Sequence, residues 1–286
     1  MTTTDPCVTD SQALAEILEE AIDDGHLTLP LMPDVAARVK VEAANPHSSA
    51  HKLAGIITTD AALAARVLRM ANSAIYAGMS EIRELDLAIG RLGAAMVVAL
   101  AVGAAGKETF HSDDPEFAEV LQEGWEESLR SAAFCRQAAP LIERSAEEAF
   151  LAGLMRRSGE PILFSVLADR IQRGKLARPD TETARRVIAR LAPRAGARLL
   201  GAWGLPRGIV NAVAWQNDFE QADEDDRLLA AITGLSGLAA ANWSSPTMAQ
   251  DLASQPAAVA AGLDAGGLSS LANRAREDWR ELAPSL

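Results

Sequence analysis

The sequence contains few cysteines and few aromatic residues. Its two cysteines, Cys7 and Cys135, form no CxxC pair, so the sequence supports neither a disulfide framework nor a structural zinc site. Aromatic residues make up only 4% of the chain, although hydrophobic residues make up 49%. Alanine, which has the highest intrinsic helix propensity, is abundant instead. This composition indicates closely packed helices rather than a sheet.

The sequence also lacks segments typical of export or membrane insertion. Its first 26 residues contain seven carboxylates and no Lys or Arg, whereas a secretory signal begins with positive charge. The longest apolar stretch, 92–105, is shorter than the ~18 residues of a membrane span and contains glycine. The net charge of −12 opposes binding to a phosphate backbone. We therefore expect a cytoplasmic protein with no membrane contact and no direct DNA binding.

Helix signals follow one another along the whole chain. Apolar periodicity, capping residues and helix breakers predict helices at 11–22, 33–44, 48–57, 60–70, 84–91, 94–108, 116–139, 145–157, 161–172, 181–191, 194–203 and 207–217, with two or three more at the end. Thr9 and Asp10 would cap the first helix and Gly25 would end it. The acidic stretch 218–226 is predicted to be a solvated loop. No stretch of strand length alternates with a period of two, so the fold class is all-α.

Candidate catalytic groups are scarce. The four histidines, His26, His47, His51 and His111, lie at helix ends or in loops, whereas a catalytic cation needs several donors converging from different helices. His47 and His51 are four residues apart, but the preceding Asn45-Pro46 disturbs the helical register, so we favour polar surface roles. The sequence has no Gly-x-Ser-x-Gly elbow and no glycine-rich phosphate loop.

Positive charge is concentrated between residues 156 and 198. This stretch holds eleven Lys or Arg and four acids, and its possible anion or partner patch comprises Arg156, Arg157, Arg186, Arg190 and Arg194. Such a patch could bind a phosphorylated ligand or an acidic protein surface. The alternative, which we favour, is a solvated face whose charges pair with acidic surfaces of the same chain.

Several segments together resemble the HDOD family, a branch of the HD-domain phosphohydrolases. The matching residues are Leu29, Pro30, Pro33, Asp60, Leu63, Asn72, Ser73, Trp125, Ser128, Gly153, Trp203 and Pro206. The resemblance covers about residues 27 to 217 and implies a two-lobe multi-helix bundle with an HD-domain-like C-terminal lobe. Because the segment 112–115 reads as a break, we assign 1–26 to an acidic N-terminal helix or extension, 27–112 to the N-terminal lobe and 113–286 to the C-terminal lobe.

The same resemblance gives the positions of a metal site. Catalytically active relatives have His or Asp at six positions that in this sequence hold Glu127, Arg156, Arg157, Ala192, Gln216 and Asn217. Arginine is permanently protonated and has no lone pair for a cation. Of the six, only Glu127 could be an ordinary ligand. We therefore predict no metal, no cofactor and no enzymatic activity, and an ion pair between Glu127 and the two arginines in place of the metal.

The resemblance also implies a role in signalling, because family members act in bacterial signal transduction and bind proteins or cyclic dinucleotides. We predict a non-catalytic regulatory module that acts through a protein partner. A receptor for a phosphate-bearing ligand such as a cyclic dinucleotide is the alternative, and a residual metal-dependent phosphohydrolase is the third hypothesis. Asn72 and Ser73 could contact a partner, but Asn and Ser at a helix end more often bind the backbone.

Overall fold

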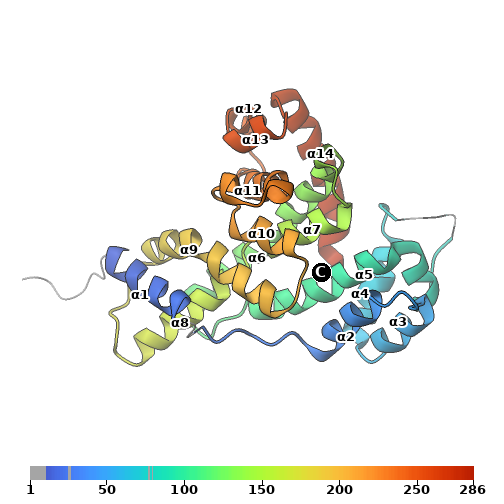
Figure 1. Cartoon of the computed structure of the whole chain (residues 1–286), viewed down its shortest axis with the longest axis horizontal. Coiled ribbons are helices and arrows are strands. Elements are labelled where there is room, and N and C mark those ends of the chain that lie inside the picture. The colour runs from blue at the N-terminus through green and yellow to red at the C-terminus, as the bar shows by residue number, and fades with distance from the viewer. Residues whose placement is uncertain (1–10, 25–26, 77, 79) are drawn as a thin grey trace, which may run out of the picture.

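The computed structural model describes residues 11–24, 27–76, 78 and 80–286, and this part of the chain is helical without strands (Figure 1). The α-helices are α1 (Ser11–Asp23), α2 (Asp34–Ala43), α3 (Ala50–Ile57), α4 (Ala61–Asn72), α5 (Leu85–Thr109), α6 (Pro115–Ala138), α7 (Ala146–Met155), α8 (Glu160–Gln172), α9 (Thr181–Ala202), α10 (Arg207–Ala214), α11 (Arg227–Ala241), α12 (Met248–Ala253), α13 (Pro256–Ala260) and α14 (Ala265–Leu282). Short 3-10 helices occupy Ala139–Ile142, Phe219–Gln221, Glu224–Asp226 and Ala283–Ser285. The all-α prediction is confirmed.

The helix predictions need three corrections. The two helices predicted around Pro193 are one helix, α9, with the proline buried inside it, because packing against α1, α8 and α10 holds both halves in line. Four α-helices, not two or three, follow the acidic stretch. That stretch is not a simple solvated loop, since it forms two short 3-10 helices and buries Asp226. The predicted cap at Thr9 and Asp10 and the stop at Gly25 lie outside the described residues.

The helix α5 joins the two halves of the molecule. Its N-terminal part packs with α2, α3 and α4, and the helix also contacts α7 (Figure 1). Gly93 interrupts it with φ 77° and ψ 157°, a backbone conformation that favours glycine, so the predicted break there is confirmed. By length and composition alone α5 could cross a membrane, contrary to the expectation above, but 56% of its most apolar window is buried inside the fold.

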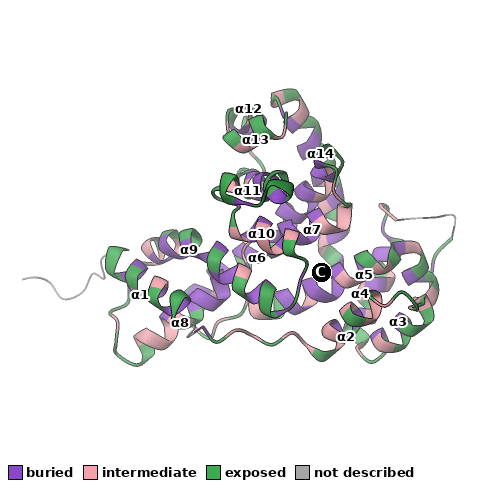
Figure 2. Cartoon of the chain, in the orientation of Figure 1, coloured by how far each residue is buried: buried purple, intermediate pink, exposed green. Residues whose placement is uncertain are grey.

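The C-terminal half is built around α6 and α7, which pack closely against each other and against α11 (Figure 1). Gly153 makes this contact possible, since a Cβ there would lie 2.6 Å from the carbonyl oxygen of Ser131. Helices α12, α13 and α14 complete the far end of this half, with α14 returning along α6. Figure 2 shows that buried residues concentrate at the centre, where α6, α7 and α11 meet.

The first helix packs against the C-terminal half rather than against its neighbour in sequence. Leu14, Leu18 and Ile22 are buried on the face of α1 that meets α8 and α9. Residues 27–33 are extended and cross the molecule to α2 (Figure 1). Trp203 Nε1 donates to the carbonyl oxygen of Pro30 in this segment at 2.8 Å. One hydrophobic cluster includes residues from Leu14 to Leu286, so the core does not divide at either predicted domain boundary. The boundaries at 26/27 and 112/113 therefore stay predictions.

Candidate functional site

The six positions that the sequence singled out lie around one helix crossing. Glu127 comes from the middle of α6, Arg156 and Arg157 follow the last residue of α7, and Ala192 lies in α9. Gln216 and Asn217 form the turn after α10. All six positions except Glu127, which contacts Arg157, line a cavity of about 90 Å³. Its lining residues are Arg156, Arg157, Glu160, Ala189, Ala192, Pro193, Gln216 and Asn217. Residues 90 positions apart in sequence thus form a single site.

Arg157 is the cation at the centre of this site. Its Nη1 donates to Glu127 Oε2, and its Nη2 donates to Glu160 Oε2 at 2.8 Å. The side chain of Arg157 is 14% exposed and that of Glu160 only 6%. Burial, the largest single influence, would lower the pKa of Arg157, but the carboxylates of Glu160 and Glu127 together outweigh it and raise that pKa. The predicted ion pair with Glu127 is confirmed for Arg157.

Arg156 has a different partner, so the predicted pairing of both arginines with Glu127 is wrong for this residue. Its Nε donates to Gln216 Oε1 at 3.2 Å, while Gln216 Nε2 donates to the carbonyl oxygens of Arg156 and Val213. Burial first, and then the charge of Arg157, lowers the pKa of Arg156 to about 10. Its Nη1 has no hydrogen-bond partner within the described residues. The guanidinium of Arg156 therefore donates to an amide oxygen, not to a carboxylate.

Two glycines of α11 make room for this arrangement. A Cβ at Gly237 would lie 2.1 Å from Nη2 of Arg156, and a Cβ at Gly234 would lie 2.0 Å from the carbonyl oxygen of Gln216. Any side chain at either position would displace the Arg156–Gln216 pair. The pair is therefore held by close helix packing as well as by hydrogen bonds.

These residues do not fit a divalent cation. The two carboxylates, Glu127 and Glu160, already accept hydrogen bonds from Arg157, and the Gln216 oxygen accepts one from Arg156. Ala192 offers only a methyl group, and two guanidinium groups would repel a cation. Across residues 11–24, 27–76, 78 and 80–286, no three His, Cys, Asp or Glu side chains gather in a way that could hold a metal ion. We derive no metal-dependent step for this site.

Glu160 belongs to this site but was not predicted from the sequence. It follows Arg157 by three residues, a spacing at which side chains on a helix meet, and this was the available signal. The histidines lie elsewhere. His51 Nδ1 lies 3.0 Å from Asp86 Oδ2 and His111 Nε2 lies 3.5 Å from Asp113 Oδ1, both on the surface. His26 lies outside the described residues.

The arginine-rich stretch is largely paired within the chain. Arg190 and Arg194 of α9 form ion pairs with Glu19 and Asp23 of α1. Arg186 is exposed and contacts the Thr183 hydroxyl at 3.5 Å. Arg156 and Arg157, in contrast, direct their donors into the α6–α7–α10 crossing. The five arginines therefore do not present their donors on one free surface, and the pairing favours the alternative interpretation of an internally neutralised face.

Most family-signature residues of the N-terminal half form hydrogen bonds with the backbone or lie at helix ends. Asp60 caps α4 by accepting from the Leu63 N–H at 3.0 Å, and Pro33 precedes α2. Asn72 Nδ2 donates to the Ile82 carbonyl oxygen, and Asn72 Oδ1 accepts from the Ile82 N–H, both at 2.8 Å. The Ser73 hydroxyl donates to the Met70 carbonyl oxygen. The backbone role for Asn72 and Ser73 is confirmed, and Leu29 packs against the core.

The signature residues of the C-terminal half fix helix contacts. Trp125 packs edge-to-face on Phe110 with ring centroids 5.4 Å apart, and Lys107 lies over its ring. Ser128 is fully buried on the same helix. Pro206 precedes α10, three residues after Trp203. These signature residues therefore lie in contacts between or at the ends of helices.

A second feature is an apolar groove between the two halves, which the sequence did not predict. It has a volume of about 900 Å³. Its walls come from the end of α2, from α5 after its kink, from the start of α7 and from residues 204–209, with Val41, Val98, Leu151, Leu205 and Ile209 among the lining side chains. Lys40, Glu147 and Glu148 also line it. Val41 is 68% exposed, so its side chain adds solvent-accessible apolar surface to the groove.

A family model for the HDOD domain matches residues 29–219, about two thirds of the chain and including all six site positions. The chain belongs to the HDOD family. Residues 220–286, with helices α11 to α14, lie beyond the matched HDOD region. The site at Arg157 is therefore part of the HDOD domain itself.

Solved structures share the fold of this HDOD chain. A protein from Shewanella amazonensis, named as a candidate metal-dependent phosphohydrolase, has a TM-score of 0.70 at 22% identity, with 93% of this chain and 99% of that chain covered. An HDOD domain protein of unknown function from Geobacter sulfurreducens has a TM-score of 0.67 at 16% identity, covering 95% and 97% of the two chains. At such low identities these likenesses show the fold alone.

A curated relative, an uncharacterised protein from Treponema pallidum, is 20% identical over 224 residues. The match covers 76% of this chain but only 42% of the relative. The HDOD chain thus spans less than half the length of that protein.

Proposed function

We propose that this HDOD chain is a non-catalytic regulatory module of bacterial signal transduction, which works in the cytoplasm by binding a protein partner. The observation that carries the proposal is the position of Arg157 between Glu127 and Glu160, where active relatives would hold a metal. A solved structure from Marinobacter aquaeolei that is similar in fold, with a TM-score of 0.63 at 21% identity over 98% of this chain and 66% of that chain, is named as a candidate signal transduction protein. That name supports a regulatory role.

The physical argument against hydrolysis is electrostatic. A cation entering this site would have to displace Arg157 from two carboxylates, one of them nearly fully buried. Arg157 would then lack an acceptor in a partly buried position, and breaking a buried ion pair in this way costs about 3–5 kcal/mol. The remaining donors, one amide and two carboxylates, would have to compensate for that cost.

Metal content and hydrolysis together test the non-catalytic part. The purified chain is stripped of metal with a chelator, incubated with Mn²⁺ or Fe²⁺ and separated from free metal. Its metal content is then measured by inductively coupled plasma mass spectrometry. We expect far less than one ion per chain, and no cleavage of bis(p-nitrophenyl) phosphate above the rate without protein. One tightly bound ion per chain together with metal-dependent cleavage would refute the proposal.

The apolar groove supports the protein-binding part. A cavity of about 900 Å³ with aliphatic walls suits an inserted apolar segment of a partner. Glu148 is already paired with Arg144, but Glu147 also lines the groove and, in a chain of net charge −12, favours a segment that carries Lys or Arg. We infer that the partner contributes such a segment.

Two valines of matched exposure test this binding. Val41 lines the groove at 68% exposure, whereas Val259 on α13 is 67% exposed and does not line it. The chain and its variants Val41→Asp and Val259→Asp are used to capture partners from the source cell, and each captured protein is then purified and titrated. A partner that binds the wild type and Val259→Asp but loses affinity for Val41→Asp supports the proposal. A set of partners unaffected by Val41→Asp contradicts it.

The arginine-rich stretch gives less support to the alternative of a phosphate-bearing ligand. Arg157, Arg190 and Arg194 already have carboxylate partners, which a ligand phosphate would have to replace. Calorimetric titration with cyclic dinucleotides tests this alternative. We expect either no heat of binding, or a heat of binding that is the same for the wild type and for Arg190→Gln.

A further inference from the structure

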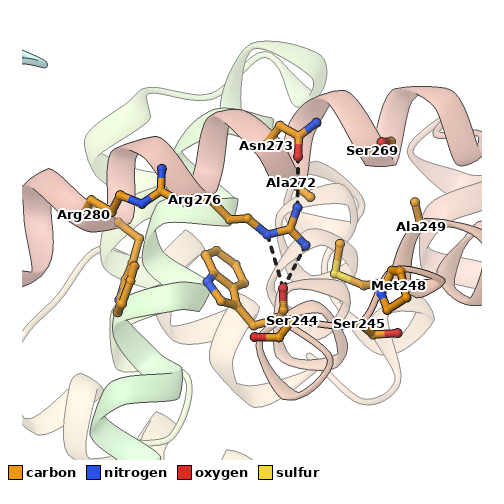
Figure 3. A pocket seen from close by; sticks show the side chains of 12 residues that line it. Ser244, Ser245, Met248, Ala249, Ser269, Ala272, Asn273, Arg276 and Arg280 are labelled. Carbon is orange, nitrogen blue, oxygen red and sulfur yellow. Dashed lines mark hydrogen bonds between the residues drawn. The ribbon is translucent and has the colours of Figure 1, made fainter.

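The far end of the C-terminal half holds a pocket of about 550 Å³, beyond the residues that the HDOD model matches. It lies between residues 243–249, which include the first residues of α12, and α14 (Figure 3). Twelve residues line it, among them Trp243, Met248, Asn273, Arg276, Trp279 and Arg280. Its volume falls within the range of about 300–1,000 Å³ that is usual for small-molecule sites.

The guanidinium of Arg276 is held in a fixed orientation in this pocket. Its Nε and Nη2 donate to the carbonyl oxygen of Trp243 at 3.2 and 2.8 Å, and its Nη1 donates to Asn273 Oδ1 at 3.0 Å (Figure 3). A guanidinium has five N–H donors, so these three bonds leave one N–H on each terminal nitrogen. Because the group is already ordered, a ligand that used these two donors would lose little side-chain entropy on binding.

Two indole rings form the aromatic part of the pocket. Trp243 and Trp279 meet edge-to-face with centroids 6.4 Å apart, and Arg276 lies 5.8 Å above the Trp243 ring. In the described structure the buried Nε1 of Trp279 has no hydrogen-bond acceptor. Trp243 is only 9% exposed and carries Arg276 over its ring, whereas Trp279 is half-buried, with Arg130 5.8 Å from its ring centroid. The aromatic surface that a planar ring can reach in this pocket therefore comes from Trp279.

The charge of the lining is opposite to that of the whole chain. Arg276 and Arg280 both line the pocket, and none of the twelve lining residues is Asp or Glu, although the chain carries a net charge of −12. Arg280 is exposed at the rim. The hydroxyls of Ser244 and Ser245 add neutral donors and acceptors beside the guanidinium groups. A small anion with polar groups therefore matches the lining.

We propose that this pocket binds a small phosphorylated ligand with a planar ring, the chemical class of nucleoside monophosphates. The phosphate accepts from Arg276 and Arg280, since a guanidinium fork matches phosphate geometry. The ring packs against the indole surface. This site is separate from the HDOD metal positions and independent of the proposed protein partner.

Calorimetry with matched ligands and variants tests the proposal. AMP and GMP are titrated into the full chain. Adenosine, which lacks the phosphate, and inorganic phosphate, which lacks the ring, serve as the two half-probes. We expect AMP or GMP to bind with a Kd below about 1 mM and the two half-probes to bind at least tenfold more weakly. Arg280→Gln should weaken binding about tenfold or more, because charge-assisted hydrogen bonds are lost.

Two further variants separate the pocket from general effects. Arg274 lies on the same helix but bonds Gln137 and Ser270 outside the pocket, so Arg274→Gln should leave the Kd within about twofold. Trp279→Phe leaves the Trp243 carbonyl oxygen that orients Arg276 in place, and it should weaken AMP and GMP binding without weakening that of phosphate. Circular dichroism confirms that each variant is folded.

Three results would overturn the proposal. The first is no heat with AMP or GMP up to millimolar concentration. The second is equal affinity for inorganic phosphate, which would show that the ring contributes nothing. The third is nucleotide binding that Arg280→Gln leaves unchanged, which would place the ligand elsewhere on the chain.

Discussion

Replacing Arg157 by alanine should destabilise the protein strongly. The substitution removes the cation shared by Glu127 and Glu160 and leaves two like charges beside each other at the α6–α7 crossing. The side chain of Glu160 is only 6% exposed, so water compensates little for the lost partner. Removing one partner of a buried ion pair costs about 3–5 kcal/mol. At about 2–4 °C per kcal/mol, the Tm should fall by about 6–20 °C.

An exposed pair of the same chemistry provides the control. Arg185 and Glu123 lie 2.6 Å apart with side chains 37% and 52% exposed, so Arg185→Ala should cost less than about 1 kcal/mol. Urea unfolding followed by circular dichroism measures both free energies of unfolding. Because the penalty arises from unpaired charge, adding Glu127→Gln and Glu160→Gln to Arg157→Ala should restore part of the stability. If Arg157→Ala unfolds at the same urea concentration as Arg185→Ala, the argument for a buried ion pair in place of the metal is refuted.

Four further outcomes follow from the packing, the hydrogen bonds and the thiol pKa of single residues. Gly159→Ala should cost about 1–3 kcal/mol in urea unfolding, because its Cβ would lie 2.0 Å from a carbonyl oxygen of α9. The exposed Gly55→Ala, with open space around its Cβ, should instead stabilise α3 by up to about 1 kcal/mol. Asn72→Ala should speed hydrogen exchange at the Ile82 N–H and cost about 1–3 kcal/mol, because Asn72 Oδ1 accepts from that N–H. Burial raises the pKa of the Cys135 thiol to about 11, so iodoacetamide at pH 8 should label it only after unfolding, once the other cysteine is replaced by serine; rapid labelling of the folded protein would contradict this.

Local features of the fold could be predicted from the sequence because they are encoded by near neighbours. Asp60 and Pro33 act within a few residues of their own helix, and the break at Gly93 depends on the conformational freedom of one residue. The pair between Glu127 and Arg157 could be predicted because the family resemblance supplied the long-range placement. The family match at residues 29–219 and the helical fold confirm that resemblance.

Features set by contacts distant in sequence could not be predicted. The sequence contains no signal that α1 would pack on α9 rather than on α2, since an amphipathic helix shows which face is buried but not its partner. The continuity of α9 through Pro193 depends on neighbours that hold both halves in line. The groove and the Trp243 pocket arise between elements, and Gln216 was expected only as a lost metal ligand, not as the partner of Arg156.

The location of α1 has a consequence for the order of events during synthesis. Glu19 and Arg190, which meet across the α1–α9 contact, are separated by 171 residues. At about 5–20 residues per second, the ribosome needs about 10–35 s to make the chain between them. A 13-residue helix has marginal stability alone in water. The surface that buries Leu14, Leu18 and Ile22 is therefore incomplete until α8 and α9 have been made, so the docking of α1 follows the synthesis of those helices.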